Sequence, residues 1–480
     1  DGGQGGFAGH ADAFRRRTSD LQVPRHEPVE DGETLSPTTR VRNSASSAEG
    51  GAVGAGLATA DGHLGLALDT YRNDYGVTVE PDVLIRMKRD RLSLGGEARR
   101  LGGLFDQVSF SASHTRYRHQ EVEGSGEVGT TFRSTGDELR LQAHHAPIGA
   151  LRGVFGLQAE TLDFSALGEE AFVPGTRTRQ QAAFALEEWD VGAWQLSAGL
   201  RGEQAKVSAE GGESRRFSPT SGSVAARVGG NEGWQGSLTL GRTERAPAYY
   251  ELFANGVHVA TGAYERGDAS LAAERGRNID AALQWAAGAS SMRVGVFEAR
   301  FSRFINLSAT GANVDVVADD GSVNAVPEYV FRSVRARLRG VEAQAKHRIE
   351  AGAWSFDLSG QLDLVRADDL SRGEPLARIA PARVRLGLDA VTGPWTAGVE
   401  LDHAARQGRV PATDVATPGH SLLNLALSRR FSLGDSDALA FVKLANATDA
   451  LAYNASTVPT VRDLAPLPGR SLKMGLRVSF

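Results

Sequence analysis

The sequence lacks several features that would point to common classes of protein. It contains no Cys, which excludes a disulfide framework, a thiolate metal site and a thiol nucleophile. No apolar run approaches the roughly 18 residues that a transmembrane helix needs. The net charge of −5 leaves no basic surplus, so no nucleic-acid partner is implied. A length of 480 residues would usually suggest several domains, but large barrels are single units.

What the chain does contain is a recurrent alternation of apolar and polar residues. In the last ten residues the apolar positions are Leu472, Met474, Leu476, Val478 and Phe480. A period of two indicates a β-strand with one apolar face and one polar face. The same alternation recurs at residues 64–69, 354–364 and 395–402. Mean hydropathy is only −0.27, which is expected of a membrane barrel because only every second residue meets lipid.

About twenty such strands are expected, and the connections between them alternate between short and long. The expected strands span residues 7–17, 51–60, 63–74, 90–100, 106–121, 133–145, 151–164, 178–190, 193–208, 219–230, 233–245, 277–287, 291–306, 335–350, 353–366, 381–392, 395–406, 419–431, 438–448 and 470–480. Short turns at one end and long loops at the other are typical of outer-membrane barrels. The sequence therefore predicts an all-β fold, a large antiparallel transmembrane β-barrel.

The tryptophans give an independent indication of a membrane. There are six, and each lies within a few residues of a short connection: Trp189, Trp194, Trp234, Trp285, Trp354 and Trp395. Amphipathic rings at one level form an interfacial girdle, whereas Trp of a water-soluble core would not follow the short turns. Five share the phase of their strand's aliphatic face. Trp189 is out of phase with Phe184 and Leu186, which predicts a β-bulge in that strand.

Several stretches carry a resemblance to a known family. The most distinctive is TERAPAYYELFANGVHVATGAYERGDASLAAERGRNID, at residues 243–280. Further matching stretches are GEVGTTFR at 126–133, FSALGEEAFVPGTRTR at 164–179, LANATD at 444–449 and GRSLKMGLRVSF at 469–480. Together they resemble the barrel of TonB-dependent outer-membrane receptors, in the branch that includes zinc-uptake receptors. The resemblance runs from residue 7 to residue 480.

The resemblance implies a 22-stranded barrel in the bacterial outer membrane, occluded by an N-terminal plug and importing a scarce metal ion or metal chelate. A TonB-type complex would supply energy through the plug. Residues 1–480 are expected to be a single barrel domain with about 20 of these strands, truncated at its N-terminus and without the plug. A gap or a forced closure is then expected between strands 7–17 and 470–480, because unpaired backbone groups are costly in lipid.

The candidate metal ligands are His258, Glu169 and Glu170, which lie in two of the matching stretches. Imidazole and carboxylate groups are suitable ligands for Zn²⁺, so zinc would be a transported ligand and no permanent cofactor is expected. Further loop residues that would surround a ligand are Tyr249, Tyr250, Glu251, Glu265 and Asp268. The alternative is a loop held together by Tyr and Glu hydrogen bonds, with His258 as one more polar residue.

Two other groups of polar residues can be interpreted either as ordinary solvated surface or as binding sites. By parity His119, Glu121 and Glu123 share one face of a strand, where three donors could hold a divalent cation. A solvated rim of a polar lumen is the favoured interpretation. Arg40, Arg42, Arg177 and Arg179 could bind anionic ligands or lipopolysaccharide phosphate, although scattered surface arginines are favoured.

Two rival functions remain open at this stage. A passive pore would share the barrel but need no energy coupling. An outer-membrane hydrolase would need a loop-borne site, yet no base stands beside a nucleophile in the sequence. The favoured function is therefore a receptor that is not an enzyme, with outer-membrane lipid and lipopolysaccharide, a TonB-type complex and a metal or chelate as partners.

Overall fold

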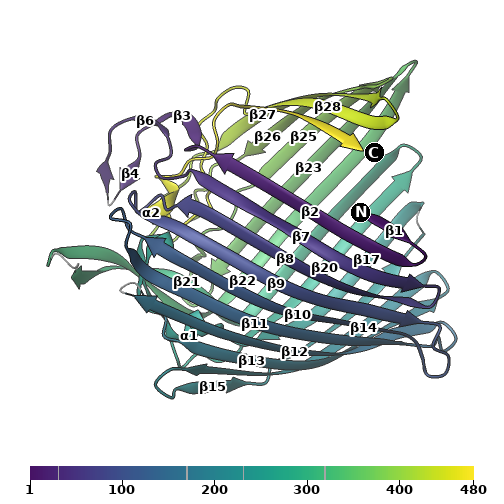
Figure 1. The fold of residues 1–480 in the computed structure, drawn as a ribbon, viewed down its shortest axis with the longest axis horizontal. Coiled ribbons are helices and arrows are strands. Elements are labelled where there is room, and N and C mark those ends of the chain that lie inside the picture. The colour runs from purple at the N-terminus through teal and green to yellow at the C-terminus, as the bar shows by residue number, and fades with distance from the viewer. Residues whose placement is uncertain (31, 169–170, 231, 318–320, 480) are drawn as a thin grey trace.

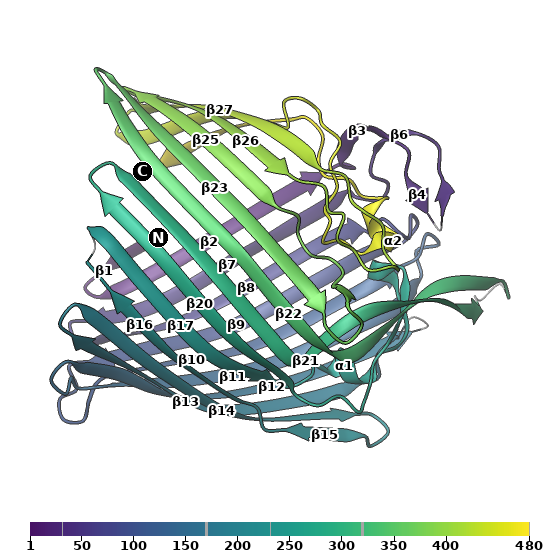
Figure 2. The same cartoon turned by 180° about the vertical axis from the view of Figure 1, so that it is seen from behind.

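The strands form a single curved wall around a lumen. The computed structural model describes residues 1–30, 32–168, 171–230, 232–317 and 321–479. Figures 1 and 2 show the molecule from opposite sides, and in each view the near and far strands tilt in opposite directions. This crossing is the geometry of strands that wrap around a barrel axis. The main sheet comprises 25 strands, of which five are short.

All twenty expected strands are present, within a few residues of the expected bounds except at the outer ends of β21 and β22, which extend well beyond them. They are β2 (Phe7–Thr18), β7 (Ser46–Thr59), β8 (Gly62–Gly76), β9 (Leu84–Arg99), β10 (Phe105–Val122), β11 (Val128–His145), β12 (Leu151–Gly168), β13 (Thr176–Val191), β14 (Trp194–Ala209), β16 (Thr220–Val228), β17 (Gly233–Arg245), β20 (Glu274–Ala287), β21 (Ser290–Val317), β22 (Val323–Ala351), β23 (Trp354–Asp369), β25 (Arg383–Thr392), β26 (Trp395–Ala404), β27 (His420–Leu433), β28 (Ser436–Ala445) and β29 (Ser471–Ser479). Each pairs antiparallel with the next along the chain.

The sheet ends at β29 on one side and at the N-terminal strands on the other. A short strand, β1 (Gly2–Gln4), pairs with the outer edge of β2. Across residues 1–30 and 471–479, no backbone ladder joins β29 to β1 or β2. The expected gap between these two strands is therefore present, and forced closure is not.

The two ends of the barrel differ as the sequence predicts. Short turns lie at one end, and the long connections gather at the other, with the chain's last strand ending among the short turns (Figure 1). The long connections contain α1 (Tyr249–Phe253), η1 (Val259–Thr261), α2 (Pro459–Arg462) and the short strands β3 (Gln22–His26), β4 (Val29–Glu30), β5 (Glu33–Thr34), β6 (Thr38–Arg40), β15 (Ser214–Phe217), β18 (Asn255–His258), β19 (Ala263–Arg266) and β24 (Glu374–Pro375). None of the helices in the described residues is long or apolar enough to span a membrane.

Two expected loops turn out to be structured. Residues 307–334 were expected to be a loop, but most of them extend β21 and β22 into a hairpin that projects beyond the wall (Figure 2). Residues 18–50 were expected to be a polar loop, but they contain two small sheets, β3–β6 and β4–β5, and the start of β7. Both segments consist of polar or β-branched residues and have no apolar stripe that faces lipid. The alternation typical of membrane-spanning strands therefore did not indicate the strands within them.

The outer and inner faces of the wall carry different side chains. On the outer face Leu57 pairs with Leu64, and Leu66 pairs with Leu94, all of them largely exposed. The opposite face carries charged pairs such as Arg89–Asp69, whose nitrogen and oxygen lie 2.6 Å apart. Because paired residues of an antiparallel ladder share a face, this division continues from strand to strand. The barrel is thus apolar outside and polar inside, as a bilayer requires.

The register corrects the expectation of a bulge at Trp189. Strand β13 pairs with β12 and β14 without any register shift. Trp189 lies opposite Leu151 and Leu196 on the neighbouring strands. It shares a face with Ala185, whose partner in β14 is the outward-pointing Leu200. The apolar residues out of place are Phe184 and Leu186, which share the lumen face, and the Phe184 ring lies beneath the Arg140 guanidinium. All six tryptophans therefore belong near the short-turn end, and no bulge is needed.

The buried core lies at the long-loop end rather than in the middle of the lumen. Residues 246–276 fold back against the inner wall, and their buried side chains include Leu252, Phe253 and Leu271. They pack on Val207 of β14 and on Phe331 of β22, among others. This packing fixes the loop that the sequence singled out, and it positions the site described next.

Candidate functional site

A short helix, α1, presents aromatic side chains from the loop that follows β17. Arg245, the last residue of β17, donates two hydrogen bonds to the Glu251 carboxylate at 2.8 and 3.1 Å. The same carboxylate accepts the backbone N–H of Ala248 at 2.7 Å, which caps the first turn. Glu251 is buried, so its role is to fix α1 against the strand and not to contact a ligand freely.

The fixed helix places two tyrosines side by side. The Tyr249 ring packs on Phe164 of β12 with a centroid distance of 4.7 Å. Tyr250 stands edge-on to Tyr249 at 5.4 Å and packs on Phe331 of β22 at 5.8 Å. Burial raises the pKa of both phenols above their usual value. Both hydroxyl groups are therefore protonated at neutral pH and can donate hydrogen bonds.

The hairpin of β18 and β19 positions His258. Its Nδ1 lies 3.0 Å from Oε1 of Glu265, and that oxygen also accepts a hydrogen bond from the Thr261 hydroxyl at 3.0 Å. The imidazole stacks on the Phe172 ring with centroids 4.4 Å apart. Glu265 is buried while His258 is about one third exposed. The sequence placed these two residues in one loop, and the structure brings them into direct contact.

An unusual ladder anchors this hairpin to the projecting strands. β19 pairs parallel with β22, with Glu265 opposite Tyr329 and Arg266 opposite Val330. The Arg266 side chain also contacts Glu328 at 3.2 Å. Because a parallel ladder joins segments far apart in the sequence, nothing in the local pattern predicted it. It holds the His258–Glu265 pair at a fixed place in the mouth of the barrel.

Strand β10 contributes a second histidine, which the sequence assigned to a solvated rim. His119 of β10 stacks on Phe132 of β11 with centroids 4.3 Å apart, and its Nδ1 lies 3.0 Å from the Tyr117 hydroxyl. Glu121, two residues further on, is buried. The favoured interpretation of a solvated rim is therefore wrong for Glu121, whereas His119 is half-buried at the cavity wall. Their neighbour Glu123 lies beyond β10, outside the cavity that they line.

These residues enclose a cavity of about 690 Å³ in the mouth of the barrel, here called the mouth cavity. Its volume falls in the range of small-molecule sites. Its lining comprises Tyr75, Val77, Ile85, His119, Glu121, Phe132, Phe164, Phe172, Tyr249, Tyr250, Glu251, His258, Ala260, Glu265, Phe304, Ile305, Asn306, Leu307, Phe331, Leu338, Leu376, Ala377, Arg378 and Ile379. The wall is thus largely aromatic and aliphatic, with a few polar groups that converge on the space.

Arg378 is the single arginine of that lining. Its backbone has a φ of 60°, a left-handed conformation that is uncommon for residues other than Gly. Its Nη2 donates a hydrogen bond to the Leu307 carbonyl at 3.1 Å. This contact holds the guanidinium at the cavity wall, where its remaining N–H groups are suited to an anionic group. No sequence pattern indicated Arg378, because its place at the cavity depends on the fold.

The other predicted ligands have different outcomes. Glu169 and Glu170 lie outside the described residues. Asp268 is absent from the cavity lining and accepts hydrogen bonds from the Ser270 amide and hydroxyl, so it shapes a turn. Within the described residues, no group of three or more His, Asp or Glu side chains is arranged to hold a metal ion. The His258–Glu265 pair alone offers at most part of a zinc site, which needs about four ligands.

Two other loops close over this region. Arg462 of α2 is almost fully buried and contacts the Asp414 carboxylate at 2.9 Å. The Thr460 hydroxyl, two residues earlier, donates to the Thr261 carbonyl in the loop that carries His258. The connections 407–418 and 449–469 are therefore linked to the site loop. No sequence pattern indicated these contacts, because they join residues from three separate loops.

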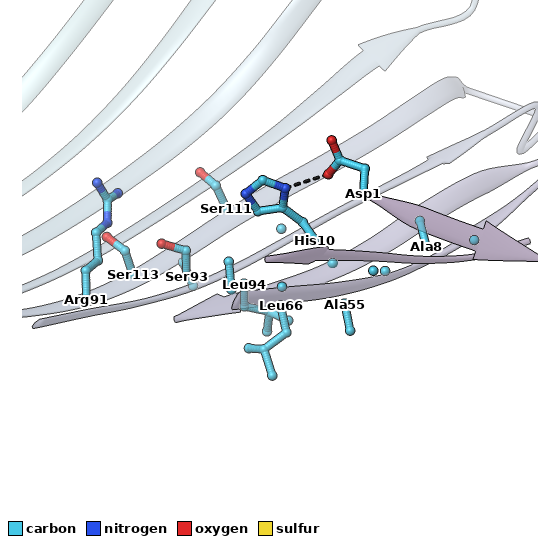
Figure 3. Close-up of a pocket in the computed structure, with 18 of the residues that line it drawn as sticks. Asp1, Ala8, His10, Ala55, Leu66, Arg91, Ser93, Leu94, Ser111 and Ser113 are labelled. Atoms are coloured by element: carbon cyan, nitrogen blue, oxygen red, sulfur yellow. Dashed lines mark hydrogen bonds and ion pairs between the residues drawn. The ribbon is translucent and has the colours of Figure 1, made fainter. Parts of the chain in front are cut away.

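A second hollow lies on the wall near the N-terminal strands. Its volume is about 830 Å³, and small residues such as Gly54, Ser93 and Ser111 form much of its lining. Figure 3 shows His10 turned toward Asp1, with Arg91 and Ser113 further along the wall. Its lining residues include no Phe, Tyr or Trp. The mouth cavity is therefore the better candidate for recognition of a ligand.

Comparisons with known proteins agree with this architecture. Residues 5–446 match a family model described as TonB dependent receptor-like, beta-barrel. Among solved structures, the copper transporter OprC has a TM-score of 0.78 at 17% identity, covering 98% of this chain and 78% of that one. The FrpB iron transporter from Neisseria meningitidis has a TM-score of 0.77 at 15% identity, covering 99% and 77%.

A third structure is a variant of the ferric enterobactin receptor PfeA from Pseudomonas aeruginosa, with a TM-score of 0.73 at 13% identity, covering 98% of this chain and 75% of that one. Identities this low establish a shared fold and nothing finer. The family match, in contrast, spans most of the chain. The chain therefore belongs to the TonB-dependent receptor-like β-barrel family, as a receptor and transporter of the bacterial outer membrane and not as an enzyme.

Proposed function

We propose that this receptor imports a metal ion held in an organic chelate, which it receives in the mouth cavity. The observation that carries the proposal is the lining of that cavity. Aromatic rings from α1 and from β10–β12 face a space of about 690 Å³, and His258, His119 and Arg378 add polar groups. A space of this size suits a small organic molecule far better than a single ion.

The ligand chemistry favours a chelate over a bare ion. A bare zinc ion would need about four protein ligands, and the described residues contain no such cluster. A chelate brings most of its own ligands, so the protein needs only to recognise its surface. His258 and Glu265 can then complete contacts at the edge of the chelate without holding the metal alone.

The family resemblance in the sequence pointed to zinc as the transported metal. Glu169 and Glu170 would have to join His258 to make a complete site for that ion. Two of the structural relatives named above are a copper and an iron transporter, and the third is a ferric enterobactin receptor, so copper and iron join zinc as cargo to test. We propose coupling to a TonB-type complex as the energy source, in keeping with the family to which the chain belongs.

An uptake experiment tests the proposal. Cells that lack the gene for this receptor, and cells that express it, are grown under iron, copper or zinc limitation and supplied with the radiolabelled metal and its chelates. We expect accumulation of one metal to depend on the receptor and to stop when the proton-motive force is collapsed. Receptor-dependent accumulation that continues without the proton-motive force would instead establish the rival passive pore.

A further inference from the structure

The hairpin formed by the outer parts of β21 and β22 projects past the wall at the long-loop end (Figure 2). The ladder between β20 and β21 ends at Arg303, and the ladder between β22 and β23 ends at Ala336. Within the described residues, 313–317 and 323–327 form backbone ladders only with each other. The outer hairpin is therefore a two-stranded ribbon whose edges are not joined to the barrel.

The two edges of this ribbon are not equally open to another strand. On β22, residues 328–330 already pair with β19, and the next residue outward is Pro327, which has no backbone N–H to donate. On β21, the Leu307 carbonyl is bound by Arg378, but no described strand lies beside the outer edge of residues 313–317. We call this segment of β21 the free edge. Its extended residues span about 17 Å, the length of a typical strand, so it can hold one further strand.

The side chains of the free edge are apolar and acidic. Asp315 and Val317 lie on one face and are exposed, Val317 by 70%. Val314 and Val316 lie on the other face and are half-buried. From residue 304 to residue 331 the sequence contains acidic residues but no Lys, Arg or His. A ligand that matches this edge must therefore combine apolar side chains with positive charge.

A free strand edge of this composition is uncommon in a folded protein. Unpaired N–H and C=O groups invite pairing with another chain, and sheets usually protect them with Lys, with Pro or with a covering segment. The free edge contains neither Lys nor Pro, and Asp315 is its one charged residue. The rest of it consists of Asn313 and three Val, a residue type that favours strands. Its composition therefore favours the addition of a strand.

We propose that the free edge binds an extended, basic segment of another protein, which adds to β21 as one more strand. Backbone hydrogen bonds supply the affinity of such a contact, and side chains at alternate positions supply its specificity. A basic side chain opposite Asp315, with apolar side chains opposite Val314 and Val316, gives favourable cross-strand pairs. Because the long loops of an outer-membrane barrel face outside the cell, the partner is a protein of the cell surface or its surroundings.

A second copy of this chain is a less suitable occupant. Two free edges paired antiparallel about their centre would set one Asp315 carboxylate directly opposite the other, and like charges in that position repel. None of the residues of the free edge belongs to the lining of the mouth cavity. The proposal is therefore independent of the cargo.

Synthetic peptides of opposite charge test this edge. The purified receptor in detergent is titrated with a peptide of alternating Lys and Val, with one of alternating Glu and Val, and with the Lys–Val peptide N-methylated at its central residues, which blocks both of its edges. We expect the first peptide to bind about tenfold or more tightly than the other two. Its isotope-labelled carbonyl groups should show the infrared band of a β-sheet on binding. Equal affinity of the N-methylated peptide would show attraction by charge alone and overturn strand addition.

Matched charge reversals test whether the peptide binds at the hairpin. Asp315→Lys should lower the affinity for the Lys–Val peptide about tenfold or more and raise that for the Glu–Val peptide. Glu210→Lys makes the same change at an exposed position just after β14, also at the long-loop end, and should leave both affinities unchanged. Folding of each variant is checked by its heat-dependent gel mobility. Retained affinity in Asp315→Lys, or an equal loss in Glu210→Lys, would contradict the assignment.

Sedimentation of the receptor without peptide tests the rival occupant. We expect a single copy, both in the wild-type receptor and after deletion of residues 313–325. A dimer that is lost on this deletion would assign the free edge to a second copy of the chain instead.

Discussion

At the scale of single residues, the proposed site centres on His258. Its imidazole is fixed on two sides, by the Glu265 carboxylate at 3.0 Å and by the Phe172 ring at 4.4 Å. Its remaining nitrogen is therefore held in a defined direction and needs no rearrangement to bind. Such a pre-oriented group lowers the entropic cost of recognition.

Replacement of His258 by Ala tests this role. We expect binding of the cargo to weaken roughly ten- to hundredfold, because one hydrogen bond to a charged or metal-bound group contributes about 1.5–3 kcal/mol. The measurement is the affinity for the imported chelate, or for zinc if zinc is the cargo, by calorimetry on the whole receptor. His347→Ala, near the short turns, is the control and should have no effect. Unchanged affinity in His258→Ala would reduce this residue to a structural role in its loop.

Arg378 sets the expected charge of the cargo. Its guanidinium is held at the cavity wall by the Leu307 carbonyl. Arg378→Gln should weaken the binding of an anionic chelate by about 1.5–3 kcal/mol, the usual contribution of a hydrogen bond to a charged group. The binding of a neutral chelate should weaken much less. Competition binding with chelates of the same metal and different charge measures the difference. An equal loss for both would show that Arg378 does not sense charge.

The sequence predicted only part of this set of residues. It identified His258, Tyr249, Tyr250 and Glu265, because all four lie in one distinctive loop. It did not identify His119 or Phe172 as neighbours of that loop, because their contacts cross from one segment to another. His119 also showed only strand parity, which fits a solvated rim as well as a binding wall.

At the scale of elements, the two-faced strands are the most predictable feature. Leu358 and Ser359 of β23 are neighbours in the chain and point to opposite sides of the wall, and both are exposed. Leu358→Arg should cost about 2–4 kcal/mol if the residue lies near the bilayer midplane, whereas Ser359→Arg faces the lumen and should be tolerated. Refolding titrations into lipid vesicles compare the two variants, and equal costs would refute the assignment of faces.

The structure also changes which lumen position is a sound control. Parity alone would make Asp357 a suitable control, but its carboxylate accepts two hydrogen bonds from Arg348, at 2.7 and 2.8 Å. Arg at position 357 would break this pair and oppose two like charges across the ladder. Lys473→Arg keeps its charge and remains a suitable control for Leu476→Arg on β29.

The loops over the mouth should behave as one linked element. Arg462→Met leaves the Asp414 carboxylate buried without its counter-ion, which typically costs about 3–5 kcal/mol. We expect faster hydrogen exchange in residues 407–418 and 449–469, with no change in the strands β2 to β22. Arg470→Met serves as the control, because its contact with Asp449 is exposed and 3.8 Å long. Exchange confined to the mutated residue's own loop would show that the loops are not linked.

Strand positions could be predicted from the sequence where a strand faces lipid, because lipid imposes an alternation of apolar and polar residues. They could not be predicted where a strand lies outside the membrane. Residues 472–476 alternate strictly, and β29 begins at Ser471 as expected. The outer parts of β21 and β22 extend past the membrane, so no lipid-facing stripe marks them. The short pieces α1, β18 and β19 depend on packing against other segments, which local periodicity cannot reveal.

At the scale of the whole molecule, the barrel combines two regions with different roles. An apolar band faces lipid, and a mouth cavity lies on the inner side between the long loops. The first follows from alternation in the sequence. The second requires the folding of one loop into the lumen, which only the structure provides.

The central claim is that the cargo is received in the mouth cavity, and the position of its metal tests this most directly. Crystals of the receptor with its cargo, measured at the absorption edge of the metal, give an anomalous peak at the metal position. We predict a peak inside the mouth cavity, between the Tyr249 ring and the His258–Glu265 pair. A receptor that takes up the cargo but shows its only peak elsewhere, for example in the hollow beside His10, would contradict the account.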